Sequence, residues 1–365
     1  MLESWGVTVV ALPLKPPIRN GNETMTEKTS DTSTPPRTIG VREVAAMAKV
    51  SVGTVSNVLN HPDRVGTATR ERVQEAMQAL GFVPSRAAGQ LRSRRSNLIG
   101  VVVPDVGNPF WATVLRGIEG VVDAAGLTMV VSSSRQDNDR QRHLLHVLES
   151  QGVDGLVIAP ISDRSDEWAA FQTSRFGVVS LERQTPGSLG AWVSLDHVEG
   201  ARMAMKHLVE SGHRKVALIN GPATVSWCAE RKQGAVQAMQ QHGLDPHDSI
   251  VDVVVDDLTV NEGSKAMASL LEEGAVTAVM CVNDMLALGA LLTMQEREIQ
   301  VPNEMALVGY DDADFAAALN PPLTTVHQPA FEMGSAAAKL LLTSSSDAAG
   351  THVTFDPRLI VRESS

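Results

Sequence analysis

The chain has 365 residues, 43% of them hydrophobic and 20% charged, and its formal net charge is −11. This length exceeds what one hydrophobic core usually supports, so we expect two or three globular domains. No run of eighteen apolar residues occurs, which excludes a membrane-spanning helix. The two cysteines, Cys228 and Cys281, form no C-x-x-C pair, which indicates reduced thiols in a cytoplasmic protein rather than a disulfide framework.

Residues 1–36 are rich in Thr, Ser, Pro and Glu, a composition that predicts a disordered N-terminal extension. Their short apolar stretch is similar to the core of an export signal. Glu3, the lack of an early positive charge and the prolines at 13, 16 and 17 argue against export. Met25 is an alternative start of translation.

The charge is divided unevenly along the chain. Residues 37–96 hold ten Lys and Arg against four Asp and Glu, a net charge of +6. Residues 97–365 hold 18 against 34, a net charge of −16. A small basic segment joined to a large acidic body indicates a nucleic-acid-binding head on a domain with a different task.

Two short helices are predicted at the start of this basic segment. In TIGVREVAAMAK, apolar residues recur at intervals of three and four from Val41 to Ala48. After a turn at Lys49, Ser51 can cap a second helix that runs from about Val52 to Leu59. Two helices joined by so short a turn form a helix-turn-helix, whose second helix enters the major groove of DNA.

The second helix turns its larger apolar residues inward and leaves small side chains outward, where they allow close approach to base edges. Asn57 can pair with adenine, and Val52 can contact a thymine methyl group. Hydroxyl groups and the free amides of the first turn can hold phosphates. The candidate DNA-binding residues of this helix are Ser51, Val52, Gly53, Thr54, Ser56 and Asn57.

A third helix, predicted in TATRERVQEAMQALG, completes a helix-turn-helix domain over residues 37–83. Residues 84–97 follow as a short basic stretch. In this stretch, Arg86 and Arg92 suit phosphate contacts, and Leu91 is the large apolar side chain among the arginines.

The run from Thr38 to Arg92 resembles the DNA-binding head and hinge of the lactose/galactose repressor (LacI/GalR) family almost residue for residue. The resemblance implies that Val52, Gly53 and Asn57 read bases. It also implies that the hinge becomes helical only when dimers bind, and that Leu91 then wedges into the minor groove.

Two residues depart from the family pattern. Lys49 stands where glycine is usual, and a left-handed backbone there would cost about 1 kcal/mol. Asn57 stands where arginine is common, so we expect an operator that differs from the family's commonest one.

From residue 98 onward, apolar runs such as LIGVVVP, VDGLVIAP and RKVALING alternate with amphipathic helical stretches. Continuous Val, Ile and Leu runs are typical of parallel sheets with helices on both faces. The expected fold is a small all-α head and hinge, followed by a two-lobed α/β body with parallel sheets and a ligand cleft between the lobes. We place one lobe at about 98–195 plus 328–345, and the other at 196–327 plus 346–365.

The loops after these strands carry forked polar side chains beside aromatic rings, which suit the vicinal hydroxyls and the apolar face of a sugar. For the aromatic residues, ordinary packing within the lobes is an equally good interpretation. The candidate effector-binding residues are Asp105, Phe110, Trp111, Arg135, Arg183, Trp227, Arg231, Asn283, Asp284 and Asp311.

Residues 98–362 also resemble the effector domain of the same family, which is similar to periplasmic sugar-binding proteins; NPFW, ERKQG and VGYDD are among the closest matches. The resemblance implies that Arg231 and Asp311 hold the effector, and that a homodimer binds an approximately palindromic DNA operator. No leucine-heptad helix follows the last strand, so we expect no tetramer. The expected protein is a cytoplasmic repressor of carbohydrate-related genes, controlled by a sugar or sugar derivative.

Several alternatives remain open at this point. The effector can instead be a purine, or the partner a phosphocarrier protein; a sugar-binding transport protein would need an export signal and no basic head. The motifs GxSxG, GxxxxGK[ST], GxGxxG and HExxH are missing, so we expect no enzyme, no catalytic residue and no cofactor. His143 and His146 are interpreted as a solvated helix face, and we expect no metal site.

Overall fold

The computed structural model of the protein describes residues 39–82, 96–161, 177–182, 191–274, 276–343 and 351–365. Its contacts divide the chain into two units, residues 1–85 and 86–365, and each unit is described by itself. The extension expected at 1–36 and most of the hinge expected at 84–97 lie outside the described residues.

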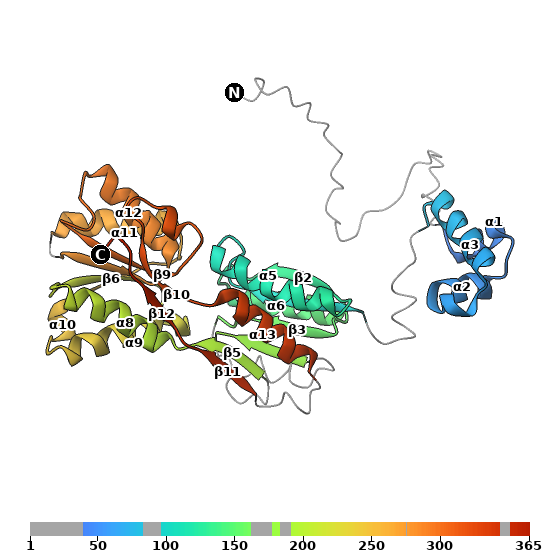
Figure 1. Ribbon diagram of the computed structural model, residues 1–365, viewed down its shortest axis with the longest axis horizontal. Helices are drawn as coiled ribbons and strands as arrows, with labels where there is room; N and C mark the ends of the chain where they lie inside the picture. The colour runs from blue at the N-terminus through green and yellow to red at the C-terminus, as the bar shows by residue number, and fades with distance from the viewer. Residues whose placement is uncertain (1–38, 83–95, 162–176, 183–190, 275, 344–350) are drawn as a thin grey trace, which may run out of the picture. The chain divides into compact units, whose positions relative to one another are not determined.

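The first unit contains three α-helices and a short 3₁₀ turn in its described part (Figure 1). These elements are α1 (Val41–Ala48), α2 (Val52–Asn60), η2 (Pro62–Arg64) and α3 (Thr67–Leu80). They share a small core made of Val44, Ala45, Ala48, Val55, Val58, Val73 and Ala76. The three helices expected from the spacing of apolar residues are therefore present.

The turn between α1 and α2 has the backbone geometry that a helix-turn-helix requires. Lys49 adopts a left-handed conformation, with φ 54° and ψ 48°, although it is not glycine. Ser51 then caps α2, because its Oγ accepts a hydrogen bond of 3.0 Å from the amide of Thr54. The strained turn and the cap expected from the sequence are both observed.

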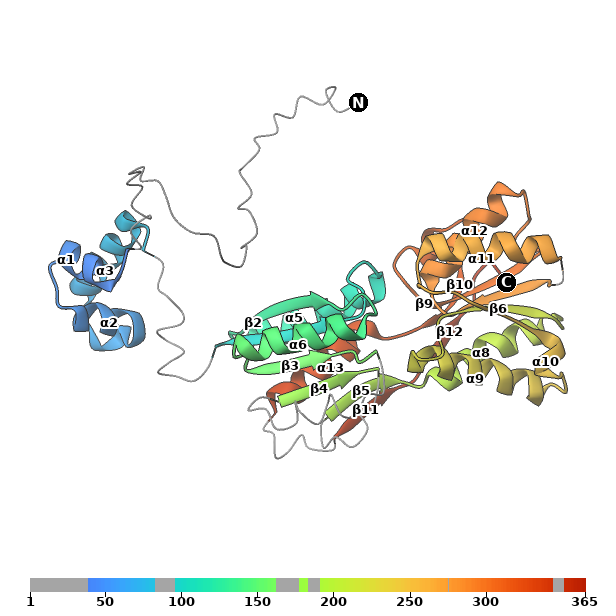
Figure 2. The same cartoon turned by 180° about the vertical axis from the view of Figure 1, so that it is seen from behind.

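The second unit contains two six-stranded sheets, and the first is wholly parallel. Its strand order is β11-β5-β4-β3-β1-β2. The strands are β1 (Leu98–Val103), β2 (Thr128–Ser133), β3 (Gly155–Ile158), β4 (Gly177–Leu181), β5 (Ala191–Leu195) and β11 (His352–Phe355). Helices α5 (Pro109–Ala124) and α13 (Ala330–Leu342) cover one face, and α6 (Asn138–Ser150) covers the other (Figures 1 and 2).

The second sheet has the order β12-β10-β9-β8-β6-β7 and is parallel except for β12. Its strands are β6 (Val216–Asn220), β7 (Ile250–Val254), β8 (Ala278–Cys281), β9 (Ala306–Asp311), β10 (Thr324–His327) and β12 (Arg358–Ile360). Helices α8 (His197–Glu210) and α9 (Ser226–Gln241) lie on one side of the sheet, and α11 (Val260–Glu273) and α12 (Asp284–Glu296) lie on the other (Figure 1). The short α10 (Pro246–Ser249) and η3 (Ala316–Ala318) complete the lobe.

The two-lobed, parallel-sheet architecture expected from the sequence is confirmed, but one lobe boundary is wrong. Residues 346–365 were assigned to the second lobe, whereas β11 pairs in parallel with β5 in the first sheet. The chain thus returns to the second lobe between Phe355 and Arg358. A strand of four residues is too short for its alternating exposure to reveal, from the local sequence, which sheet it joins.

Close packing of α8 against α9 in the second lobe brings together two residues that are far apart in the sequence. A Cβ atom on Gly234 of α9 would lie 2.0 Å from the carbonyl oxygen of Val198 of α8, so only glycine permits this approach. Arg231 lies one turn before Gly234, and His197 is the first residue of α8. The glycine therefore brings Arg231 and His197 together, although they are 34 residues apart.

Candidate functional site

The exposed face of α2 is the candidate DNA interface. Val52 is 47% exposed, and Gly53 and Asn57 are also exposed. The hydroxyl groups of Ser51 and Thr54 lie 2.9 Å apart, which orients both at the start of the helix. Small side chains and a capped helix start on one exposed face suit a helix that enters a groove.

The remaining polar residues of this helix fit the same arrangement. Ser56 is half-buried, and its carbonyl oxygen accepts a hydrogen bond of 2.7 Å from the side chain of Asn60. The hinge candidates Arg86, Leu91 and Arg92 lie outside the described residues.

A pocket between the two lobes is the candidate effector site, and the space between its atoms amounts to about 260 Å³, open solvent included. Its walls come from the loops and helix starts that follow the parallel strands of both sheets, as the strand-end rule requires. Nine described residues line the pocket: Asn108, Phe110, Trp111, Glu182, Trp227, Arg231, Asn283, Asp311 and Gln328.

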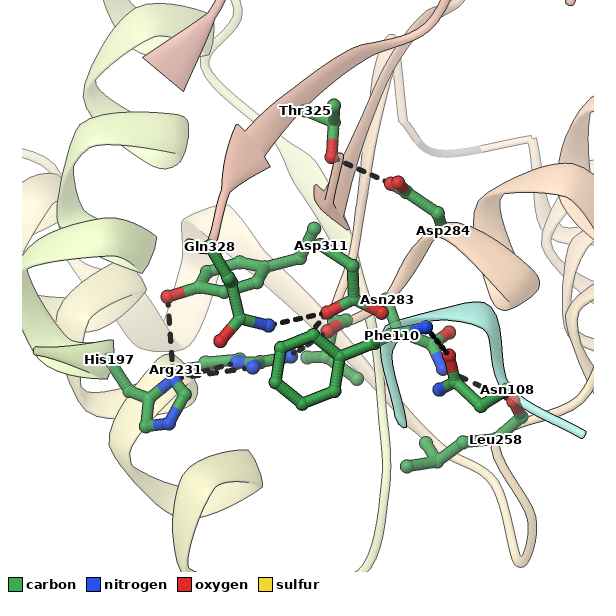
Figure 3. A network of polar contacts seen from close by, with 12 residues as sticks. Asn108, Phe110, His197, Arg231, Leu258, Asn283, Asp284, Asp311, Thr325 and Gln328 are labelled. Carbon is green, nitrogen blue, oxygen red and sulfur yellow. Dashed lines mark hydrogen bonds and ion pairs between the residues drawn. The ribbon is translucent and has the colours of Figure 1, made fainter. Parts of the chain in front are cut away.

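Arg231 lies at the centre of this pocket and is only 3% exposed (Figure 3). Its guanidinium group stacks 3.6 Å from the ring centroid of Tyr310 and 4.7 Å from that of Trp227. Its Nη1 donates to the carbonyl oxygen of Val282 and lies 3.9 Å from Asp311 Oδ1. Stacking and hydrogen bonds therefore hold the guanidinium plane in one orientation.

The same guanidinium group also determines the proton position on His197. Arg231 Nε and Nη2 lie 3.3 and 3.2 Å from His197 Nδ1. Arginine only donates hydrogen bonds, so Nδ1 must be the accepting nitrogen. The proton of the neutral ring is then on Nε2, which donates a short hydrogen bond to Glu182 Oε2. Glu182, His197 and Arg231 thus form one directed hydrogen-bonded chain.

Asp311 and Gln328 form a second polar pair in the pocket. Gln328 Nε2 donates a hydrogen bond of 2.6 Å to Asp311 Oδ1. Burial raises the pKa of Asp311 well above its ordinary value, and the nearby Arg231 opposes that shift. Asp311 also has a φ of 121°, a strained backbone conformation for a residue other than glycine. Strain and a shifted pKa on one residue of a pocket are typical of functional sites.

The aromatic candidates lie on the pocket walls. Phe110 and Trp111 pack edge to face, with ring centroids 4.9 Å apart, in the first turn of α5. Asn108 caps this helix by accepting a hydrogen bond of 2.9 Å from the amide of Phe110. Asn283 likewise caps α12 through the amide of Leu286. These caps position helix starts at the pocket edge.

Six of the ten expected effector residues thus line the pocket, and three others do not. Asp105 accepts a hydrogen bond of 2.8 Å from the amide of Gly107 in its own loop, and Arg135 is exposed with a φ of 55°. Asp284 is buried beside the pocket, where it accepts hydrogen bonds from Thr325 Oγ1 and the amide of Ala313. Arg183 lies outside the described residues.

Four residues of the site were missing from the sequence-based candidates. Asn108 caps α5, Glu182 follows β4, His197 begins α8, and Gln328 follows β10. The apolar run that ends at Leu181 was the available signal for Glu182, and the short run that ends at His327 was the one for Gln328, because strand ends meet at one edge of a parallel sheet. His197 follows a strand by two residues in a segment that switches lobes, so its partners could not be predicted locally.

The described part of the chain contains no helix long and apolar enough to cross a membrane. A helix-turn-helix head joined to a two-lobed body with a polar pocket between its lobes defines a ligand-responsive DNA-binding regulator. Residues 40–85 match the family model described as bacterial regulatory proteins, lacI family. Residues 205–365 match the model of a periplasmic binding protein-like domain.

The chain belongs to the lacI family of bacterial regulatory proteins. It is 31% identical over 338 residues to the HTH-type transcriptional repressor PurR of Aliivibrio salmonicida, a match that covers 89% of this chain and 98% of that protein.

Two solved structures are also similar. One is the transcriptional regulator CelR in complex with cellobiose, with 30% identity, a TM-score of 0.67, and coverage of 90% of this chain and 100% of that chain. The other is the lac repressor dimer bound to operator and the anti-inducer ONPF, with 28% identity and a TM-score of 0.76; the match covers 90% of this chain and 99% of that chain.

Proposed function

We propose that this protein is a homodimeric repressor that binds a pseudo-palindromic operator through α2 and its hinge, and that a small molecule in the interlobe pocket controls its DNA affinity. The single observation that carries the proposal is the buried Arg231–Asp311 pair, which lies in the pocket between the two lobes. The chain that contains this pair belongs to a family of bacterial regulatory proteins. A ligand that binds one lobe arrangement better than another shifts the population between them.

Within the head, we propose that Val52, Gly53 and Asn57 contact bases, and that Ser51, Thr54 and Ser56 contact the phosphate backbone. Arg86 and Arg92 would add phosphate contacts from the hinge, and Leu91 would insert into the minor groove.

A carbohydrate-like effector is the proposed ligand class. Aromatic walls beside forked polar groups suit a sugar ring, and the similar regulator CelR has been solved with cellobiose. We propose no catalytic activity, because the described pocket residues include no hydroxyl, thiol or amine nucleophile.

Selection of bound duplexes from a random library tests the regulator proposal. The full chain should enrich one palindromic sequence, whereas Asn57→Ala should lose preference at one base position in each half-site. Glu119→Gln, an exposed substitution on α5 in the other unit, is the matched control. Binding without any sequence preference would contradict the proposal.

A further inference from the structure

Lys49 lies in the turn between α1 and α2, and its own Cβ atom disfavours the conformation that it adopts. Its φ of 54° lies in the left-handed region, which glycine occupies without strain. Its backbone amide donates to the carbonyl oxygen of Ala46, a bond that glycine would make equally well. The side chain is exposed, and its ammonium group has no hydrogen-bond or ion-pair partner among the described residues. The described contacts of the head therefore give no structural reason for a lysine at this position.

The helices of the candidate DNA interface carry very little charge, and Lys49 is their cation. Between Glu43 and Asp63 the chain contains one Lys or Arg, which is Lys49, and no Asp or Glu. The carboxyl group of Glu43 accepts a hydrogen bond of 2.9 Å from the amide of Gly40, at the opposite end of α1. Residues 39–82 as a whole hold five Lys and Arg against four Asp and Glu, a net charge of only +1. Lys49 is therefore the positive charge that the end of α1, the turn and all of α2 offer to a polyanion.

The turn that contains Lys49 adjoins the groove in the arrangement that helix-turn-helix domains share. The second helix enters the major groove with its first residues, and the first helix crosses the DNA backbone. Lys49 ends α1 and precedes the capping residue Ser51 by two positions, so it joins the two helices at this crossing. A lysine ammonium group is a compact charge on a flexible stem and suits a phosphate group. An exposed lysine here can reach the strand that borders the groove.

We propose that Lys49 binds a phosphate group of the operator backbone, and that the strained turn is kept for this contact, which glycine cannot make. Strained residues that a fold does not require are typical of functional sites. The proposal rests on DNA binding by α2 in the proposed function. A phosphate contact carries no sequence information, so Lys49 sets the affinity and its salt dependence, and the residues of α2 set the base preference.

A second role for the charge acts on folding and not on DNA. Lys49 is the C-cap of α1, and a cation at the C-terminal end of a helix interacts favourably with the helix dipole. That effect changes the stability of the head and leaves the salt dependence of DNA binding unchanged. The two roles therefore differ in what a substitution at this position does to DNA affinity.

Fluorescence anisotropy on the full chain tests the phosphate contact. The probes are the operator selected by the wild type and a scrambled duplex of equal length, and the variant is Lys49→Gly. At about 50 mM salt, the variant should bind both duplexes at least about tenfold more weakly. A dimer loses two phosphate contacts, so this difference should narrow about tenfold between about 50 mM and about 200 mM salt.

Two further variants serve as controls. Lys49→Arg keeps the charge and should retain the wild-type salt dependence. Lys339→Ala, an exposed substitution on α13 in the other unit, should bind both duplexes like the wild type. Because glycine removes the backbone strain, a loss of affinity in Lys49→Gly cannot come from unfolding, and urea unfolding of the head verifies this.

Unchanged affinity and salt dependence in Lys49→Gly would overturn the proposal. A changed base preference with an unchanged salt dependence would also overturn it, because that result would indicate a contact to a base. Failure of the proposed function is distinguishable: the wild type would then select no operator sequence, whatever the effect of Lys49→Gly on the scrambled duplex.

Discussion

Single residues in this protein carry strain that the surrounding structure must offset. Lys49, Glu182 and Asp311 all have positive φ values, of 54°, 65° and 121°. Such conformations cost of order 1 kcal/mol or more each for residues with a Cβ atom. Two of the three line the effector pocket, whereas Lys49 lies in the turn of the head.

Replacing Lys49 by glycine should stabilise the head. Glycine adopts the left-handed conformation without steric cost, so we expect the free energy of unfolding to rise by about 0.5–1 kcal/mol. Urea unfolding of residues 37–83, followed by circular dichroism, measures the change. The matched control is Lys49→Ala, which keeps the Cβ strain and should give no gain.

Arg231→Lys should weaken effector binding by about tenfold or more, although the positive charge remains. Lysine lacks the planar fork that spans His197 and the stacking surface that lies against Tyr310. Calorimetry with a probe that binds the wild type measures the loss. Arg202→Lys, whose arginine pairs with Glu199 on α8, is the control; an equal loss there would contradict a specific role for Arg231.

At the scale of elements, the buried carboxyl group of Asp284 connects the start of α12 with β10 and with the loop after β9. Asp284, the first residue of α12, accepts hydrogen bonds from Thr325 of β10 and from Ala313, which follows β9. Burial raises the pKa of Asp284 from 3.8 to about 7, against the opposing effect of these hydrogen bonds.

This raised pKa predicts that the protein loses stability as the pH rises. The unfolded carboxyl group releases its proton near pH 3.8, whereas the folded one keeps it up to about pH 7. The stabilising contribution is therefore complete below about pH 4 and is lost as the pH passes through 7. Melting temperatures between pH 5 and 8 should fall in the wild type and less steeply in Asp284→Asn. Equal slopes would contradict this, and the exposed Asp256→Asn is the control.

At the scale of the whole molecule, the head and the body are separate units. Every described residue that lines the effector pocket lies in the second unit, and every described candidate for DNA contact lies in the first. Control of DNA binding by an effector therefore requires coupling between the two units.

Removal of residues 1–96 should abolish operator binding and leave ligand binding intact, because the body has its own core. Electrophoretic mobility shift and calorimetry with one wild-type ligand measure the two activities. The control is a chain that lacks only residues 1–24, which should retain both. Sequence-specific DNA binding by the truncated body would contradict the modular arrangement.

The sequence by itself determined the helices of the head, the cap at Ser51 and the alternation of strands and helices, because these depend on local spacing and local hydrogen bonds. It also located six pocket residues, since parallel strands bring their carboxyl ends to one edge. Only the tertiary structure decided that β11 joins the first sheet, that Asp105 and Arg135 lie away from the pocket, and that His197 links Glu182 to Arg231. These features depend on which side chains meet across elements far apart in the chain, and no local pattern encodes such contacts.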